Sequence, residues 1–464
     1  MLNVQLRGLF SLKKLLIINF SLLIFTSCSV QQKISKSAKQ VINDTSLLTA
    51  HVGISIYEPE SGKYWYNYQG DKYFVPASNT KIPTCYAAMK YLGDSLIGLR
   101  YRIFSDSVVK IQSTGDPTFL HTDFLYQPGY TFLKKYKYII FSGELFNEDF
   151  LGSGWTWNDY KNAYSAQRSD FPIYGNTVKF KWEDKNSISA KPEVFMKSVA
   201  IMEDLTTGFD IIKPWEDNKF LFLKGSEKSK EIPFRPDILS INSLLQDTLG
   251  SYVTTSFDKP GYAQSTEVTF FAQGKTIKIP NQPATKNEKL YRLNSQPTDS
   301  LLKPLMHRSD NFFAEQSLLM VSNERLGIMS DEKIIDTLLK TDLKDLPQKP
   351  RWADGSGLSR YNLFTPQDFV AILNKMKNEF GMERIKVIFP TGGTGTISNY
   401  YKADSTFIFA KTGTLSGVVA LSGFLYTKKG KLLIFSTLVN NHQASSTAVR
   451  RAVEKFIQGI REKY

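Results

Sequence analysis

Ser78 and Lys81, three positions apart, are the pair of residues in this sequence with the clearest potential for chemistry. On a helix this spacing places both side chains on one face, about one turn apart. A serine hydroxyl needs a nearby base to become a nucleophile, and a partly buried lysine loses its charge readily enough to act as that base. Pro76 before the pair and Gly93 after it are typical of a helix start and a helix end. The sequence therefore predicts a nucleophilic serine at the positive end of a helix.

Two further motifs follow downstream. The spacing Ser-x-x-Lys alone is weak evidence, because it also occurs by chance elsewhere in the chain. Ser309, Asp310 and Asn311 form a second motif, and the segment from Lys411 to Thr414 reads Lys-Thr-Gly-Thr. The three motifs in this order are far stronger evidence than any one of them.

Together these motifs are similar to those of the penicillin-recognising serine enzymes. More specifically, the chain resembles the peptidase S13 family of D-alanyl-D-alanine carboxypeptidase/endopeptidases, the class C low-molecular-weight penicillin-binding proteins. Four more segments carry the resemblance: Ser113 to Thr118, Gly154 to Trp157, Asp310 to Glu315, and Asp354 to Arg360. The resemblance extends from about residue 45 to the C-terminus and is weakest between about 185 and 285.

The resemblance implies a catalytic role for four side chains. Ser78 would attack the carbonyl of a D-Ala-D-Ala peptide bond, and Lys81 would take its proton. Ser309 would pass a proton to the leaving amine, because a hydroxyl both donates and accepts; otherwise it is an N-cap or turn serine. The amide of Asn311 would hold a substrate carbonyl and Lys81; otherwise it makes a helix-terminal hydrogen bond.

The third motif is implied to bind the substrate. Lys411 and Thr412 would hold its terminal carboxylate, and Gly413 would let the peptide lie against the strand edge. The backbone N–H groups of Ser78 and Thr414 would form the oxyanion hole. The expected partners are peptidoglycan peptides that end in D-Ala-D-Ala, and β-lactam antibiotics. No cofactor is implied, and the four histidines lack the paired spacing of a metal site.

Two other functions compete with this interpretation. A class A β-lactamase carries a Glu-x-x-Leu-Asn segment between the second and third motifs, and its glutamate directs the deacylating water. Here Leu373 and Asn374 are present, but Val370 stands in the place of the glutamate. The second alternative is a non-catalytic lipoprotein of the cell envelope that uses the same fold as a binding module.

Residues 1–28 have the features of an export signal. Basic residues precede an apolar run from Leu15 to Phe25, which is too short to span a bilayer comfortably. The run ends in a segment similar to a lipobox, with Cys28 as the lipidated residue. Phe25 replaces the usual leucine there, so simple secretion is the alternative. Residues 29–45 are polar and rich in serine and lysine, which predicts a tether to the membrane. We expect an exported, periplasmic protein.

Length, charge and cysteine content set further limits. The 464 residues, 42% of them apolar, are enough for two or three domains. The net charge is +14, and removal of residues 1–28 would leave +11. A basic surface suits an anionic cell envelope, whereas the chain has no basic helix or arm that would predict binding to nucleic acid. Of the two cysteines, Cys85 is expected to be a buried packing residue below Ser78.

Strand patterns at both ends of the chain predict one shared sheet. Residues 51–56 alternate between polar and apolar, a returning strand follows at 64–68, and further strands are expected at 407–411, 418–426 and 432–439. Apolar residues then recur at helical spacing from Val449 to Ile460.

Helical patterns occupy the segments between these strands. One pattern, from 301 to 319, includes the second motif, and another begins at Thr365 and Pro366. Pro83 predicts a tight or irregular start of the helix that follows Ser78.

Residues 99–289 show short apolar runs between turn residues, which predicts mostly β inserted material. We therefore expect an α/β fold of the α+β type. Residues 46–98 and 290–464 would form a serine β-lactamase/transpeptidase-like catalytic domain, in which helices flank an antiparallel sheet. Residues 99–289 would form one or two accessory domains.

Overall fold

The computed structural model describes residues 34–464 apart from 40–41, 46, 143–145, 147, 184–186, 203–209, 224–228, 257–266, 273–274 and 281–289. The predicted export signal and its Cys28 therefore lie outside the described residues. Within the described part of the chain, no helix is both long enough and apolar enough to cross a membrane.

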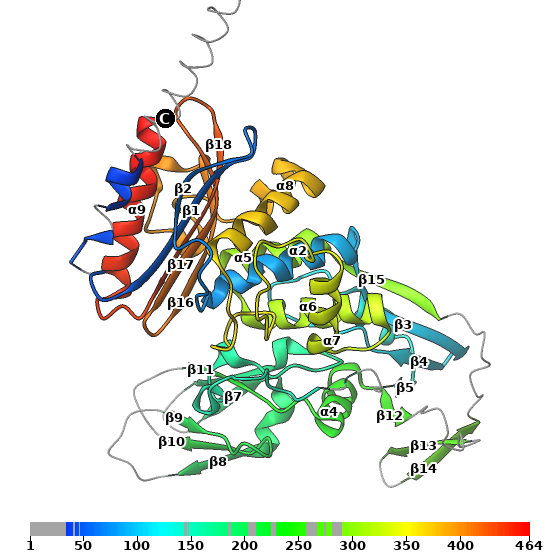
Figure 1. Ribbon diagram of the computed structural model, residues 1–464. Coiled ribbons are helices and arrows are strands. Elements are labelled where there is room, and N and C mark those ends of the chain that lie inside the picture. Colours follow the sequence, from blue (N-terminus) through cyan, green and yellow to red (C-terminus); the bar gives the residue numbers. More distant parts are fainter. Residues whose placement is uncertain are drawn as a thin grey trace, which may run out of the picture.

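The strands predicted at both ends of the chain form one five-stranded antiparallel sheet of order β16-β17-β18-β1-β2 (Figure 1). The strands are β1 (His51–Glu58), β2 (Lys63–Tyr68), β16 (Ile408–Leu415), β17 (Val418–Tyr426) and β18 (Leu432–Asn440). β1 and β18 pair from His51 opposite Asn440 to Tyr57 opposite Ile434. The prediction that strands from both chain ends share a sheet is therefore confirmed.

Helices cover both faces of this sheet, α9 (Ser446–Lys463) on one and α8 (Pro366–Ile388) on the other (Figure 1). Side chains alternate between the two faces along a strand. On β18, Ile434 packs in the apolar cluster that contains α8, and its neighbour Phe435 packs in the cluster that contains α9. The predicted apolar side of α9 is buried at Val449, Val453, Phe456 and Ile460.

Helix α8 begins where the sequence predicts. Thr365 is its N-cap and Pro366 occupies the first turn, where a missing N–H costs no helical hydrogen bond. Thr365 and Asp368 form a capping box, in which each side chain accepts a hydrogen bond from the other's backbone N–H.

Part of the segment predicted as a tether packs on the folded protein instead. Residues 34–39 are helical, and Ile34 and Ala38 are buried in the cluster on the α9 side of the sheet. Ser37 accepts a hydrogen bond of 2.8 Å from Lys463 at the end of α9. The segment is polar overall, but Ile34 and Ala38 lie four positions apart and therefore on the same face of a helix. Their apolar side chains are enough to dock one helical turn.

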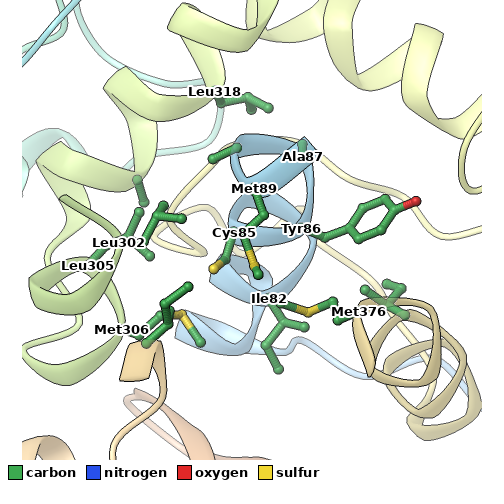
Figure 2. Packing of buried hydrophobic residues seen from close by; sticks show 14 of the residues in the cluster. Ile82, Cys85, Tyr86, Ala87, Met89, Leu302, Leu305, Met306, Leu318 and Met376 are labelled. Atoms are coloured by element: carbon green, nitrogen blue, oxygen red, sulfur yellow. The ribbon is translucent and has the colours of Figure 1, made fainter. Parts of the chain in front are cut away.

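Helix α2 (Lys81–Tyr91) lies within the helical layer on the α8 side of the sheet. Figure 2 shows its apolar side chains packed among residues of α5 (Thr298–His307), α6 (Asn311–Leu326) and α8. Cys85 is fully buried there, which confirms its predicted packing role. This packing fixes the N-terminal end of α2, immediately after Ser78.

The helical pattern predicted over residues 301–319 is divided between two helices, α5 and α6. The chain breaks between them at Arg308 to Asp310. Ser309 has a φ of 62°, in the left-handed region that a right-handed helix cannot contain. Asp310 then caps α6, since its carboxylate accepts a hydrogen bond of 3.0 Å from the N–H of Phe313. The apolar periodicity on both sides of the break concealed this start signal.

A second five-stranded sheet, of order β12-β5-β4-β3-β15, lies beyond the helical layer (Figure 1). Its strands are β3 (Ser95–Ser105), β4 (Val108–Gln112), β5 (Tyr138–Ser142), β12 (Tyr252–Ser256) and β15 (Tyr291–Pro297). β3 starts before residue 99, and its partner β15 ends after residue 289. β3 therefore crosses the predicted limit at residue 99, whereas β15 begins at Tyr291, just after the other limit, and joins the sheet of the inserted residues.

The remaining inserted residues are mostly β, as predicted. Smaller sheets have the orders β11-β6-β7, β8-β10-β9 and β13-β14. Their strands are β6 (Thr177–Trp182), β7 (Ile188–Lys191), β8 (Val199–Met202), β9 (Asp210–Ile212), β10 (Phe220–Leu223), β11 (Ser229–Pro233), β13 (Glu267–Ala272) and β14 (Lys275–Pro280). Two α-helices are described among them, α3 (Pro128–Leu133) and α4 (Ile238–Leu249).

Candidate active site

Ser78 lies in a short 3-10 helix, η1 (Ala77–Thr80), that runs directly into α2. In a 3-10 helix, side chains three positions apart lie directly above each other, so they are closer together than on an α-helix. The Lys81 Nζ accordingly lies 3.2 Å from the Ser78 Oγ. The irregular helix start predicted from Pro83 is confirmed, because η1 precedes α2 and Pro83 falls within the first turn of α2.

Lys81 is completely buried and uses its ammonium group on three partners. Besides Ser78, Nζ donates to the Asn311 Oδ1 at 2.6 Å and to the backbone carbonyl of Ser356 at 2.7 Å. Burial lowers the pKa of Lys81 to about 8, although nearby carboxylates act in the opposite direction. A lysine with this pKa is neutral in a sizeable fraction of molecules near neutral pH, and its neutral form can accept the serine proton.

The second motif enters the site through the break between α5 and α6. Ser309 accepts a hydrogen bond of 2.8 Å from Lys411. It does not cap α6, because the N-cap of that helix is Asp310. Asn311 is the first residue of α6, and its Oδ1 holds Lys81 as the resemblance implies. Its Nδ2 donates to the Tyr164 carbonyl at 2.9 Å, which uses one of its two N–H bonds and leaves the other for a substrate carbonyl.

Lys411 on β16 is a second fully buried lysine. Its Nζ donates to Ser309 at 2.8 Å and to the Thr412 carbonyl at 2.7 Å, and among the described residues it has no carboxylate within ion-pair distance. Burial, Lys81 and Arg450 lower its pKa well below the usual value for lysine. A bound anion would reverse this effect, so the position suits a ligand carboxylate.

The two threonines of the third motif make contacts that the sequence does not reveal. Thr412 donates to the Thr396 hydroxyl at 2.8 Å, and the hydroxyl of Thr414 accepts a hydrogen bond from Arg450 on α9. Arg450 therefore reaches the strand that carries the predicted carboxylate site. No sequence motif marked this arginine, because it lies in an ordinary amphipathic helix.

Gly413 also has a structural reason, besides the role that the resemblance implies. A Cβ at this position would lie 2.5 Å from the backbone carbonyl of Pro76 and 3.1 Å from the backbone nitrogen of Asn79. Glycine thus lets β16 pack directly against η1. Since β16 is an edge strand, this contact brings the backbone of Thr414 and that of Ser78 to the same end of the site.

A cavity of about 410 Å³ extends from the second motif toward the inserted residues. Its lining includes Ser309 and Asn311 of the second motif and His121, Thr177 and Glu231 of the inserted residues. The insertion therefore supplies part of the surface beside the catalytic residues.

The backbone groups that contribute to this site have no signature in the sequence. The carbonyls of Tyr164 and Ser356 hold Asn311 and Lys81, and any residue type supplies a carbonyl. Only the family resemblance marks two other segments, Gly154 to Trp157 and Asp354 to Arg360. Their contacts emerge from the three-dimensional arrangement alone.

Comparisons with known proteins agree with the family that the sequence resembles. The model of the D-Ala-D-Ala carboxypeptidase 3 (S13) family matches residues 34–463. The D-alanyl-D-alanine carboxypeptidase DacB of Haemophilus influenzae is 23% identical over 440 residues, which cover 86% of this chain and 87% of that protein. A D-alanyl-D-alanine carboxypeptidase of an Actinomadura species is 24% identical over 458 residues, with 89% and 82% coverage.

Solved structures share the fold. Penicillin binding protein 4 of Haemophilus influenzae superposes with a TM-score of 0.67 at 21% identity, covering 92% of this chain and 98% of that one. A predatory peptidoglycan endopeptidase of Bdellovibrio bacteriovorus gives a TM-score of 0.51 at 14% identity, with 89% and 93% coverage. The expected fold, a penicillin-binding catalytic domain with an insertion, is thereby confirmed. Because the family model spans nearly all of the described residues, this chain belongs to the D-Ala-D-Ala carboxypeptidase 3 (S13) family.

Proposed function

We propose that this protein is a serine D-Ala-D-Ala carboxypeptidase that cleaves peptidoglycan stem peptides through an acyl-enzyme on Ser78. The single observation that carries the proposal is the convergence of all three motifs on one buried lysine and its neighbours. The Lys81 Nζ contacts both Ser78 and Asn311, and the Lys411 Nζ contacts Ser309. Family membership independently points to the same reaction.

Acylation follows from the positions of these groups. The Ser78 Oγ attacks the carbonyl carbon of the penultimate D-alanine while Lys81 takes its proton, which gives a tetrahedral intermediate. The backbone N–H groups of Ser78 and Thr414 stabilise the oxyanion. The C–N bond then breaks, Ser309 donates a proton to the departing amine of D-alanine, and the proton on Lys81 restores Ser309. The peptide remains as an ester on Ser78.

Deacylation uses the same groups in reverse. Once D-alanine has diffused away, a water molecule enters its place and gives a proton toward Lys81 while its oxygen attacks the ester carbonyl. The ester bond breaks, and Ser78 regains its proton. Lys411 and Thr412 contribute by holding the terminal carboxylate during acylation, since Lys411 is a buried lysine without a protein carboxylate as partner among the described residues, and a bound carboxylate would favour its charged form.

Loss of the Lys411 ammonium group is expected to affect substrates according to whether they carry a carboxylate. A charge-assisted contact is worth about 1.5–3 kcal/mol, so Lys411→Ala should lower kcat/KM for a D-Ala-D-Ala peptide by about 10- to 100-fold. The same peptide with an amidated C-terminus should be cleaved slowly by the wild-type protein and should lose much less on substitution. Release of D-alanine, or of its amide, measures both rates.

Equal losses for the free and amidated peptides would give Lys411 another role, such as orienting Ser309. No release of D-alanine from any such peptide by the wild-type protein would contradict the proposed function itself.

We also propose that the protein is exported and anchored by lipid at Cys28. The short apolar run that ends at this cysteine supports the anchor, and relatives that act on D-alanyl-D-alanine or on peptidoglycan support export. Cys28→Ser should leave the protein either uncleaved or soluble in the periplasm, because two or more acyl chains are needed for stable anchoring. Detergent partitioning measures the change. A Cys28→Ser variant that loses the signal, as shown by its mass, and still partitions like the wild-type protein would contradict a lipid anchor.

A further inference from the structure

A loop wedged between the two catalytic helical segments supplies the third partner of Lys81. This loop runs from Asp354 to Ser359. A Cβ on Gly355 would lie 2.8 Å from the Ala314 carbonyl on α6, and a Cβ on Gly357 would lie 1.9 Å from the Ala77 carbonyl on η1. Gly357 also has a φ of 82°, which favours glycine. Only this sequence of small residues lets the loop backbone touch both segments.

One peptide group of the loop links Lys81 to a carboxylate. The Ser356 carbonyl accepts a hydrogen bond of 2.7 Å from the Lys81 Nζ. The N–H of that same peptide group belongs to Gly357, and it donates to the Asp354 Oδ1 at 2.8 Å. An anion on the N–H side of an amide strengthens its carbonyl as an acceptor, because hydrogen bonds in a chain polarise one another. Asp354 can therefore act on Lys81 without touching it.

The Asp354 carboxylate is held in a fixed orientation. It is fully buried, and its Oδ1 accepts a second hydrogen bond of 2.7 Å from the Asn362 side chain. Its Oδ2 accepts from the Ser359 N–H at 2.7 Å and from the Trp155 Nε1 at 3.0 Å. Four donors offset the cost of burying a carboxylate. Trp155 comes from the inserted segment, so the insertion also reaches this group.

We propose that Asp354 is a positioning residue for the catalytic base, acting through the Ser356–Gly357 peptide group to fix and polarise the carbonyl that orients Lys81. This inference rests on the proposed role of Lys81 as the base. It gives a function to two segments that no catalytic step uses, the Asp-Gly-Ser-Gly loop and the tryptophan of the insertion.

Other charged side chains near Lys81 also affect its pKa. Asp354, Glu315 and Asp310 each raise the pKa of Lys81, and Lys411 is the neighbouring cation. Glu315 accepts a hydrogen bond of 2.7 Å from the Ser356 N–H, which belongs to the preceding peptide group. Among these carboxylates, Asp354 is thus the one bonded to the amide whose carbonyl Lys81 uses.

Asp354→Asn is the decisive variant, because asparagine keeps the size of the side chain and loses its charge. We expect the second-order rate constant for acylation by a fluorescent penicillin to fall about 10²-fold through misplacement of the base. The acid limb of its pH profile should also move to lower pH, by about one unit, because a carboxylate that raises the pKa of Lys81 is gone. A purely structural role would lower the rate without moving this limb.

Two further variants keep the test decisive. Trp155→Phe removes one of the four donors but keeps the Asp354 carboxylate and its bond to Gly357, so it should lower the rate much less than Asp354→Asn and leave the acid limb in place. If Asp354→Asn does not fold, the exchanged pair Asp354→Asn with Asn362→Asp retains one carboxylate and one amide in the cluster. The exchanged pair moves the carboxylate away from the N–H of Gly357. It should therefore show the same loss of acylation rate and the same shift of the acid limb as Asp354→Asn.

The inference is overturned if either Asp354 variant folds and acylates with the wild-type rate and acid limb, or if Trp155→Phe shows the same defect as Asp354→Asn. Failure of the proposed function is a separate result. In that case Ser78→Ala would retain wild-type acylation, whereas a failure of this inference alone leaves Ser78→Ala inactive.

Discussion

Ser78→Ala is expected to abolish both the cleavage of D-Ala-D-Ala peptides and covalent labelling by a fluorescent penicillin. The Ser78 Oγ is the hydroxyl 3.2 Å from the Lys81 Nζ, and an acyl-enzyme cannot form without it. The wild-type protein should instead carry a long-lived penicilloyl group, measured as a mass increase on the peptide that contains Ser78. Retention of labelling by the alanine variant would remove Ser78 from its proposed role.

The long lifetime of this adduct follows from the chemistry of the opened ring. A peptide loses D-alanine after acylation, but the leaving group of a β-lactam stays attached and blocks water from that side. Escape requires a base that activates water from another direction, as the glutamate of class A β-lactamases does. Val370 occupies the corresponding sequence position, and it is buried in the apolar cluster around α8. Lys81 and Ser309 would face the side that the opened ring blocks.

The same experiment separates the three functions that the sequence leaves open. Stable labelling supports the carboxypeptidase, rapid multiple turnover of penicillin would favour a β-lactamase, and an unlabelled wild-type protein would favour a binding module. Cys85→Ala is a matched control, because Cys85 carries a thiol on the same helical segment as Ser78 and is fully buried. This variant should be labelled like the wild-type protein.

Residues with strong local signals were predictable from the sequence. The helix start at Pro76, the capping pair at Thr365 and Pro366, and the strands that carry β-branched residues all appear where local propensity places them. The three motifs could also be expected to meet, because strands from both chain ends form one sheet and β16 is its edge next to η1.

Other features of the site depend on backbone geometry, which leaves little trace in the sequence. The left-handed Ser309 separates α5 from α6, although apolar residues continue through the break. The Ser356 carbonyl that holds Lys81 has no side-chain signature, and Asp354 acts through a peptide group. The predicted limit at residue 99 falls inside β3 for a similar reason, since β3 pairs with β15 through backbone hydrogen bonds that the sequence does not mark.

Lys81→Ala is expected to slow acylation by about 10²- to 10⁴-fold, the usual contribution of general-base catalysis. Because burial lowers the pKa of Lys81 to about 8, the neutral fraction of this lysine rises with pH up to that value. The acylation rate of the wild-type protein should therefore increase about tenfold per pH unit well below pH 8 and level off above it. This limb should be absent from the alanine variant.

Lys81→Arg separates a base from a mere positive charge. Arginine keeps the charge next to Ser78, but it does not lose its proton in proteins and cannot accept one from the serine. If Lys81 acts as the base, the arginine variant should be about as slow as the alanine variant at every pH. If the lysine acts instead through its charge, the arginine variant should recover most of the rate, and the wild-type rate should fall above pH 8 as the charge is lost. Stopped-flow measurement of acylation by a fluorescent penicillin, on both sides of that pH, distinguishes these outcomes.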